Sequence, residues 1–484
     1  MKNSPLSSLA RRTGPPPISW LMQLALSRPQ LISLAAGFTD NESLPVAEVS
    51  KTVGDILRHR KSALPALQYG TTQGDPTLRE LTARRLQHLD GAKSAAAYSS
   101  ERMLITNGSQ QFLYMVTEAL CDPGDIVIVE DPTYFVYLGI LQSHGVQARG
   151  VRMEADGLDL DHLEALLTSL QKRGQLSRLK ALYLVSYFQN PTGITTSFAK
   201  KVAALKLLKK FERAAGHPIY LLEDAAYREL RFGHLTKWSA KPGDLDQPPV
   251  NHSKSSHSPR PSGERAGERG SEKLNLLTPA LSSFGGGEGD ATSRAFGERS
   301  ALAAKGFGDR VIYTSTYSKP FATGARIGFG ALPEPLFTAV LRIKGNHDFG
   351  SANLLQQLLA RALASGRYEH HLHALQQRYA RKAATMRAAL QKYFPPEVQW
   401  AEATGGLYFW AKLPRGVATG PKSKLFQAAL AKDVFYVPGV LCYAEDSSRR
   451  QPAHEMRLSF GGASEENIRE GVKRLGAVLT SFVI

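Results

Sequence analysis

A lysine and an arginine seven residues apart have the side chains for covalent chemistry on a phosphorylated aldehyde. Lys319 follows Ser318, and Arg326 is framed by glycines two residues away on either side. A lysine amine can form a Schiff base with an aldehyde, and the planar guanidinium of arginine binds phosphate through a fork of donors. Such a pair is also common on ordinary protein surfaces, so its meaning depends on the rest of the chain.

A second motif places a glycine where a strand is expected to give way to a helix. The apolar run 103–105 precedes Asn107 and Gly108, and a helical pattern of apolar residues follows over 112–120. Glycine lets the backbone approach a phosphate, and the first turn of a helix offers unpaired N–H groups and a favourable dipole. Ser109 and Gln110 would add side-chain donors. The simpler interpretation is a serine that only caps a helix.

Three later apolar runs, 126–129, 182–185 and 219–222, also end in polar or aromatic residues. In a parallel sheet such ends share one edge, where ligands bind. After the first run, Tyr134 could lie flat against a planar heterocycle. After the second, Asn190 opens an Asn-Pro-Thr-Gly turn and could donate to a ring oxygen.

The third run ends in Asp224, with Tyr227 three residues later. A carboxylate beside a pyridine nitrogen keeps that nitrogen protonated, which lets the ring accept electrons. Tyr227 would be a second contact to the ring oxygen. Each motif alone has a structural explanation, as a cap, a turn or a core aromatic. Together and in this order they indicate a site for pyridoxal phosphate (PLP).

The motifs resemble those of the class I/II aminotransferases of PLP fold type I, over nearly the whole chain. The versions at 108–111 and 188–193 are most similar to the kynurenine/2-aminoadipate aminotransferase branch. The resemblance implies a large α/β domain, with a mostly parallel sheet covered by helices on both faces, and a smaller α+β domain. It also implies a homodimer with shared active sites.

The resemblance assigns roles to individual residues. Lys319, Asp224 and Tyr134 would be catalytic, as the Schiff-base lysine, the partner of the ring nitrogen and the ring stacked on the cofactor. Asn190 and Tyr227 would contact the ring oxygen. The phosphate would be held by Ser109, Gln110, Thr316, Ser318 and Arg326, and by Tyr69 of the neighbouring subunit. Arg457 would bind the substrate carboxylate, together with Asn190 and Gly37. No metal is expected.

The reaction predicted from these roles is transamination between an L-amino acid and a 2-oxo acid through pyridoxamine phosphate. Two alternatives use the same site. A carbon-sulfur β-lyase would start from the same covalent complex with the substrate, and an effector sensor of this fold would bind an amine without turnover. A sensor would need a DNA-binding domain ahead of the fold, and similarity to the family begins at about Leu34, which leaves no room for one.

Composition agrees with an intracellular metabolic enzyme. The chain has 484 residues, of which 42% are hydrophobic and 21% charged, and only two cysteines, Cys121 and Cys442. These features predict two domains in a reducing compartment, and the cytoplasm is the default location. No apolar run is long enough to span a bilayer. The net charge of +17 is spread along the chain, so specific nucleic-acid binding is not expected.

The expected domain order is an N-terminal segment, 1–44, that joins the small domain, a large domain at 45–345 and a small domain at 346–484. The small domain would contain one long helical pattern from Leu354 to Tyr393. Residues 241–306 are rich in Ser, Gly, Pro and charge. Such a segment has too little apolar surface to offset its ordering entropy, so a disordered insertion is predicted there.

Overall fold

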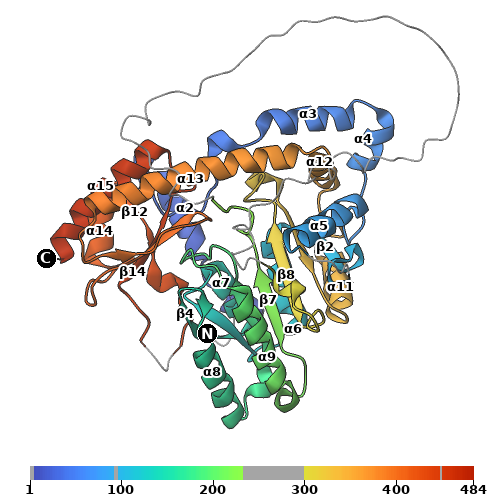
Figure 1. Cartoon of the computed structure of the whole chain (residues 1–484), viewed down its shortest axis with the longest axis horizontal. Helices are drawn as coiled ribbons and strands as arrows, with labels where there is room; N and C mark the ends of the chain where they lie inside the picture. The colour runs from blue at the N-terminus through green and yellow to red at the C-terminus, as the bar shows by residue number, and fades with distance from the viewer. Residues whose placement is uncertain (1–4, 92–95, 233–298, 447–449, 484) are drawn as a thin grey trace, which may run out of the picture.

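The computed structural model describes residues 5–91, 96–232, 299–446 and 450–483, and an eight-stranded sheet forms the centre of the large unit (Figure 1). The strand order is β2-β9-β8-β7-β6-β3-β4-β5. Neighbours from β8 to β4 are parallel, while β9 runs antiparallel to both β2 and β8, and β5 runs antiparallel to β4. The strands are β2 (Met103–Asn107), β3 (Ile126–Asp131), β4 (Gln147–Glu154), β5 (Gly157–Leu158), β6 (Leu179–Val185), β7 (Tyr220–Asp224), β8 (Val311–Thr316) and β9 (Ile327–Ala331).

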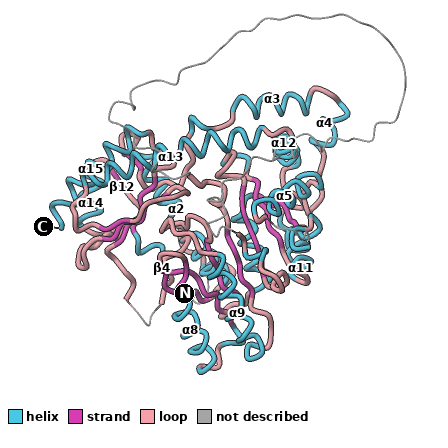
Figure 2. The backbone as a smooth tube through the Cα atoms, in the orientation of Figure 1, coloured by secondary structure: helices cyan, strands magenta, loops and turns pink. Residues whose placement is uncertain are grey.

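Helices cover both faces of this sheet (Figure 2). Along β3, Val127 and Val129 belong to one hydrophobic cluster, while Ile126 and Ile128 belong to another. This alternation explains why the strands read as continuous apolar runs, since both faces are buried. The helices of this unit are α5 (Pro76–Leu89), α6 (Gly108–Leu120), α7 (Phe135–His144), α8 (Leu160–Lys172), α9 (Phe198–Ala215) and α11 (Leu336–His347).

A second, antiparallel sheet lies in the C-terminal part of the chain, with the order β10-β11-β14-β13. The N-terminal segment joins this part, because β1 (Ile32–Ser33) pairs with β12 (Val434–Phe435). The other elements are α1 (Ser8–Arg12), α2 (Pro17–Ser27), α3 (Val46–Leu57), α4 (Arg60–Leu67), α12 (Asn353–Ala364), α13 (Arg367–Tyr393), β10 (Gln399–Trp400), β11 (Tyr408–Lys412), α14 (Lys424–Ala431), β13 (Val437–Pro438), β14 (Glu455–Ser459) and α15 (Glu465–Val483).

The helical pattern from Leu354 to Tyr393 is two helices, α12 and α13, rather than one. Gly366 separates them with φ +74°, in the left-handed region that glycine adopts at little cost. The apolar periodicity continues across the break, so the pattern alone did not reveal it. Among the described residues, no helix is long and apolar enough to cross a membrane.

The end of the predicted insertion is folded, which corrects the expectation for residues 299–306. Ser300, Ala301 and Leu302 are buried, and 301–303 form a 3₁₀ turn. Ser300 donates hydrogen bonds from its backbone N–H and its hydroxyl to Asp90, and the N–H of Ala301 donates to Glu223. The carboxylates of Asp90 and Glu223 accept these hydrogen bonds, and the apolar Ala301 and Leu302 are buried, so this short segment is ordered. Residues 241–298 lie outside the described residues, so the rest of that prediction stays untested.

Candidate active site

One cavity brings together the residues that the sequence motifs singled out. Its volume is about 120 Å³, and it lies where β3, β6, β7 and β8 end and α6 begins. That edge is where parallel α/β sheets bind ligands. The cavity is lined by Ser109, Gln110, Tyr134, Val185, Asn190, Asp224, Ala226, Tyr227, Thr316, Ser318, Lys319, Thr323 and Arg326.

Lys319 follows β8 and reaches the N-terminal segment. Its Nζ donates a 2.8 Å hydrogen bond to the carbonyl oxygen of Gly37. Burial lowers the pKa of Lys319 to about 8, and the charges of Arg326 and Arg457 act in the same direction. A larger neutral fraction near physiological pH makes this amine a better nucleophile and base than an exposed lysine.

Asp224, the last residue of β7, is held in place by two donors. The hydroxyl of Tyr183 donates to Oδ2 at 3.0 Å, and the backbone N–H of Ala226 donates to Oδ1 at 3.1 Å. Burial raises the pKa of Asp224 to about 6, although both hydrogen bonds lower it. A cation beside this carboxylate would stabilise the charged form, which is what a protonated ring nitrogen provides.

Another part of the cavity, around Arg326 and the start of α6, has hydrogen-bond donors for an anion. Arg326 has φ +50°, a left-handed conformation that is uncommon for a non-glycine residue, and its Nη1 lies 3.5 Å from the hydroxyl of Ser318. Gly108 makes room for it, since a Cβ there would lie 2.5 Å from Nη2. Ser109 and Gln110 lie in the first turn of α6, where helix N–H groups are unpaired.

Thr316 lines the cavity, but its hydroxyl hydrogen is used inside the protein. It donates to the carbonyl oxygen of Ile327 at 3.0 Å and accepts from the N–H of Ser318 at 3.0 Å. In this arrangement its hydroxyl fixes the turn that presents Ser318 and Lys319.

Arg457, on β14, lies buried beside the cavity. Its Nη1 donates to Oδ1 of Asn190 at 2.7 Å, and its Nη2 donates to the carbonyl oxygen of Ala35 at 2.6 Å. The guanidinium lies over the ring of Tyr408, 4.3 Å from the centroid. Its buried Nε has no hydrogen-bond partner among the described residues. A buried cation with an unsatisfied donor fits a site that receives a carboxylate.

Tyr69 is the one predicted cofactor-binding residue that does not line the cavity. It follows α4, is 81% exposed, and packs edgewise on the exposed Phe349, with ring centroids 5.4 Å apart. Its expected role belongs to a neighbouring subunit, so it stays a prediction.

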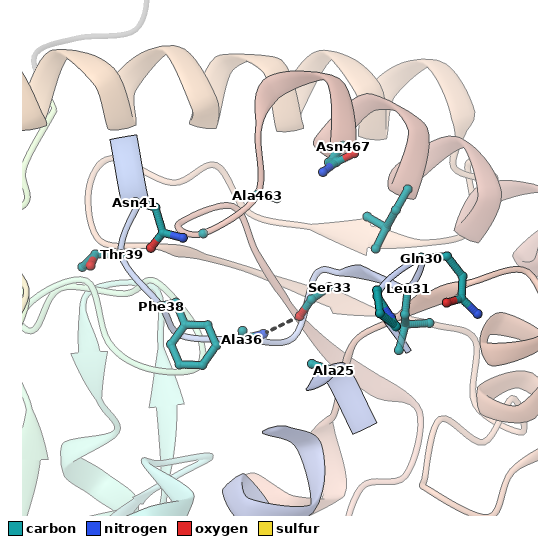
Figure 3. A pocket seen from close by; sticks show the side chains of 13 residues that line it. Ala25, Gln30, Leu31, Ser33, Ala36, Phe38, Thr39, Asn41, Ala463 and Asn467 are labelled. Atoms are coloured by element: carbon teal, nitrogen blue, oxygen red, sulfur yellow. Dashed lines mark hydrogen bonds between the residues drawn. The ribbon is translucent and has the colours of Figure 1, made fainter. Parts of the chain in front are cut away.

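A larger cavity of about 320 Å³ lies between the N-terminal segment and the start of α15 (Figure 3). The N–H of Ala36 donates to the hydroxyl of Ser33 there, and Phe38 lies beside it. None of its lining residues is titratable, so it offers no group for proton transfer. The chemistry therefore belongs to the smaller cavity, which has the lysine and the aspartate.

Sequence reasoning missed Tyr183, Tyr408 and Thr323. Tyr183 lies inside an apolar strand and Tyr408 follows a Gly-Gly-Leu run, so each looked like a core residue. Their contacts with Asp224 and Tyr227 depend on strand neighbours and on the second sheet. Thr323 is only four residues from Lys319, and that proximity was the one signal available.

Comparison with known proteins gives the family. The chain matches the sequence model of the aminotransferase class I and II family over residues 29–256 and 280–475, and it belongs to that family. It is 29% identical to aromatic-amino-acid aminotransferase 1 of Thermococcus litoralis, over 93% of this chain and 88% of the relative. It is 28% identical to 2-aminoadipate transaminase of Thermus thermophilus, over 94% of this chain and 92% of the relative.

A solved structure gives the fold. The kynurenine aminotransferase of Pyrococcus horikoshii, solved in complex with PMP, has a TM-score of 0.76 and 26% identity, and the match covers 98% of this chain and 97% of that one. The predicted PLP fold type I is confirmed, as is the prediction of a PLP-dependent aminotransferase. The comparisons do not favour the lyase or the sensor.

The cavity fits the cofactor that the family uses. Three cations, Lys319, Arg326 and Arg457, converge on a site whose lining residues include one carboxylate, Asp224. This excess of positive charge suits a phosphate at one end and a substrate carboxylate at the other. PLP supplies the electron sink that stabilises negative charge on the substrate α-carbon. The protein supplies the amine, the carboxylate and the hydrogen-bond donors that bind the two anionic groups.

Proposed function

We propose that the enzyme transfers amino groups with glutamate and 2-oxoglutarate as its general pair, and with 2-aminoadipate, aromatic or branched-chain amino acids as partners. The names of the similar proteins, which include aromatic-amino-acid, 2-aminoadipate and kynurenine aminotransferases, support the 2-aminoadipate and aromatic partners. The observation that carries the proposal is the convergence of Lys319 and Asp224 in one cavity, with Arg457 bonded to a residue of its lining.

Lys319 is the proton carrier in this proposal. With PLP bound, Lys319 would hold the cofactor through its amine, and the same amine, once free, would accept and return the proton of the substrate α-carbon. The lowered pKa of Lys319, about 8, supports the base role. Gly37 accepts from the amine at 2.8 Å, which keeps the lysine at the substrate side of the cavity.

The other residues hold and orient the two ligands. Asp224 would keep the ring nitrogen protonated, Tyr134 would stack on the ring, and Asn190 and Tyr227 would donate to the ring oxygen. Arg457 binds the substrate carboxylate, with Asn190 and Gly37 beside it. The phosphate would be held at the end of the cavity formed by Ser109, Gln110, Thr316, Ser318 and Arg326.

We also propose that the enzyme is a cytoplasmic homodimer in which Tyr69 reaches the partner's phosphate site. Tyr69 is 81% exposed and packs on the exposed Phe349, so both rings are accessible to a second copy of the chain. Within one subunit, residues 1–44 and 346–484 form the small domain and 45–345 the large one. The pairing of β1 with β12 supports that division.

Visible absorption of the purified holoenzyme tests the proposal. Adding single amino acids without an acceptor should change the cofactor band and release an equivalent of 2-oxo acid, which identifies the donors. Lys319→Ala should lose both the band and turnover. Formation of pyruvate and ammonia from a sulfur amino acid over many turnovers would instead establish a lyase.

A further inference from the structure

Tyr408 connects the substrate-carboxylate site to the cofactor-oxygen site. Its hydroxyl lies 2.9 Å from the hydroxyl of Tyr227, and the two rings are in edge-to-face contact with centroids 5.6 Å apart. The guanidinium of Arg457 lies over the Tyr408 ring, 4.3 Å from its centroid. Tyr408 is 2% exposed, so both contacts are made away from water.

The backbone of the N-terminal segment fixes the position of this hydroxyl. A Cβ at Gly37 would lie 2.7 Å from Oη of Tyr408, so the hydroxyl packs directly on a glycine that has no side chain. Strand β11 supports the other side, because it pairs with β14 and places Trp410 opposite Arg457. Tyr408 therefore has little freedom to turn away from Tyr227.

Counting protons decides which tyrosine donates. A phenol has one hydrogen to donate and can accept as well. The proposed function needs the hydrogen of Tyr227 for the ring oxygen of the cofactor. The bond between the two hydroxyls must then run from Tyr408 to Tyr227, since Tyr227 has no second hydrogen. The cation over the Tyr408 ring favours that direction, because it withdraws electron density and makes the Tyr408 hydroxyl a stronger donor.

We propose that Tyr408 is a positioning residue, which donates its hydroxyl hydrogen to Tyr227 and so directs the hydrogen of Tyr227 to the cofactor ring oxygen. This inference rests on the proposed role of Tyr227. The proposal links Arg457 to the ring oxygen through two tyrosines, Tyr408 and Tyr227. The titratable and charged groups near Tyr408 are Arg457, Tyr227, Tyr134 and Tyr379.

The spectrum of the cofactor reports this hydrogen bond without reference to turnover. A donor to the ring oxygen stabilises negative charge there, so loss of the donor raises the pH midpoint of the cofactor's visible absorption change. We expect Tyr227→Phe to raise that midpoint by about one unit, as for a hydrogen bond to a charged group. Tyr408→Phe should raise it by about half as much, since Tyr227 keeps its hydrogen but loses its orientation.

Tyr408→Phe keeps the ring, the contact with Arg457 and the fold, and removes only the hydroxyl. Tyr436→Phe is the matched control. Its hydroxyl is also buried in the C-terminal part of the chain but donates to the carbonyl oxygen of Thr419, at 3.0 Å. The control should leave the spectral midpoint unchanged. Apoenzyme affinity for PLP, measured by fluorescence titration, should fall a few-fold in Tyr408→Phe and stay constant in the control.

The double variant gives the decisive comparison. In a Tyr227→Phe background, Tyr408→Phe should have no further effect on the midpoint, because the residue through which it acts is gone. The inference is wrong if Tyr408→Phe leaves the midpoint unchanged while Tyr227→Phe moves it, or if the two shifts add fully. If Tyr227→Phe itself has no effect, the proposed role of Tyr227 is wrong, and the inference fails with it.

Discussion

Nη1 of Arg457 donates a 2.7 Å hydrogen bond to Oδ1 of Asn190, which joins the C-terminal sheet to the turn after β6. The bond settles how the Asn190 amide is turned, since its oxygen is occupied and its NH₂ group is left to donate. The residue proposed to bind the substrate carboxylate thus also orients a residue proposed to bind the cofactor.

Replacing Arg457 with leucine should therefore weaken binding of the substrate more than binding of PLP. Loss of a buried cation that pairs with a carboxylate typically costs about 2–5 kcal/mol, so we expect KM for amino acid and oxo acid to rise by about 100-fold. PLP should still bind, with an altered band, because Arg326 is unchanged. Steady-state kinetics and visible absorption measure the two effects. An unchanged KM would contradict the proposed carboxylate site.

Gly108→Ala should weaken cofactor binding. Alanine strongly disfavours φ +76°, and its Cβ would lie 2.5 Å from Nη2 of Arg326. The guanidinium must move away from the phosphate end of the cavity, so the dissociation constant of PLP from the apoenzyme should rise about tenfold or more. Gly324→Ala is the control, since a Cβ there has no heavy atom within 4 Å. Equal affinity for PLP in both variants would show that Gly108 does not contribute to the phosphate site.

Tyr183→Phe should make PLP binding dependent on pH near neutrality. The hydrogen bond from Tyr183 lowers the pKa of Asp224, which burial raises to about 6. Removing the donor raises that pKa further, so less of the carboxylate is ionised at pH 6–7 than in the parent. We expect affinity for PLP to fall several-fold at pH 6.5 and to recover toward pH 8. A loss of affinity that is constant with pH would point to packing instead.

The free amine of Lys319 should control how fast the apoenzyme takes up PLP. Burial, Arg326 and Arg457 together lower its pKa to about 8, and only the neutral amine attacks an aldehyde. The rate should rise about tenfold per pH unit below pH 8 and level off above it. Stopped-flow absorbance measures it. In Arg457→Leu, the pH above which the rate of PLP uptake becomes constant should be higher than in the parent. The same pH in both proteins would show that Arg457 does not lower the pKa of Lys319.

Asp90 should matter for stability rather than for the reaction. It pairs with the buried Arg228 and accepts from Ser300 and Tyr98. Asp90→Ala removes one partner of a buried ion pair and the acceptor of these hydrogen bonds, which typically costs about 3–5 kcal/mol. Glu80→Ala, which removes the exposed pair with Arg84, should cost less than about 1 kcal/mol. Urea unfolding compares them, and equal costs would contradict a special role for the buried pair.

Local sequence predicted the site better than it predicted the connections between site residues. Each motif lies at a strand end, so apolar runs followed by Tyr134, Asn190, Asp224 and Lys319 placed these residues on one edge of the sheet. The link from Arg457 to Asn190 and the contact of Tyr408 with Tyr227 join segments far apart in sequence, and no local pattern encodes them. The fold of 299–306 depends on Asp90 and Glu223 for the same reason.

The pairing of β2 with β9 has a consequence for biosynthesis. Asn107 lies opposite Ile327 in that pair, so Ser109 at the start of α6 and Arg326 just before β9 meet only when both strands are in place. A ribosome must deliver the chain through β9 before the anion end of the cavity exists. PLP binding therefore cannot stabilise a nascent chain that ends before β9. The long-range pairing of β2 with β9 is expected to form slowly. Cells that are short of PLP would accumulate the complete apoprotein, which is less stable than the holoenzyme, rather than shorter folded fragments.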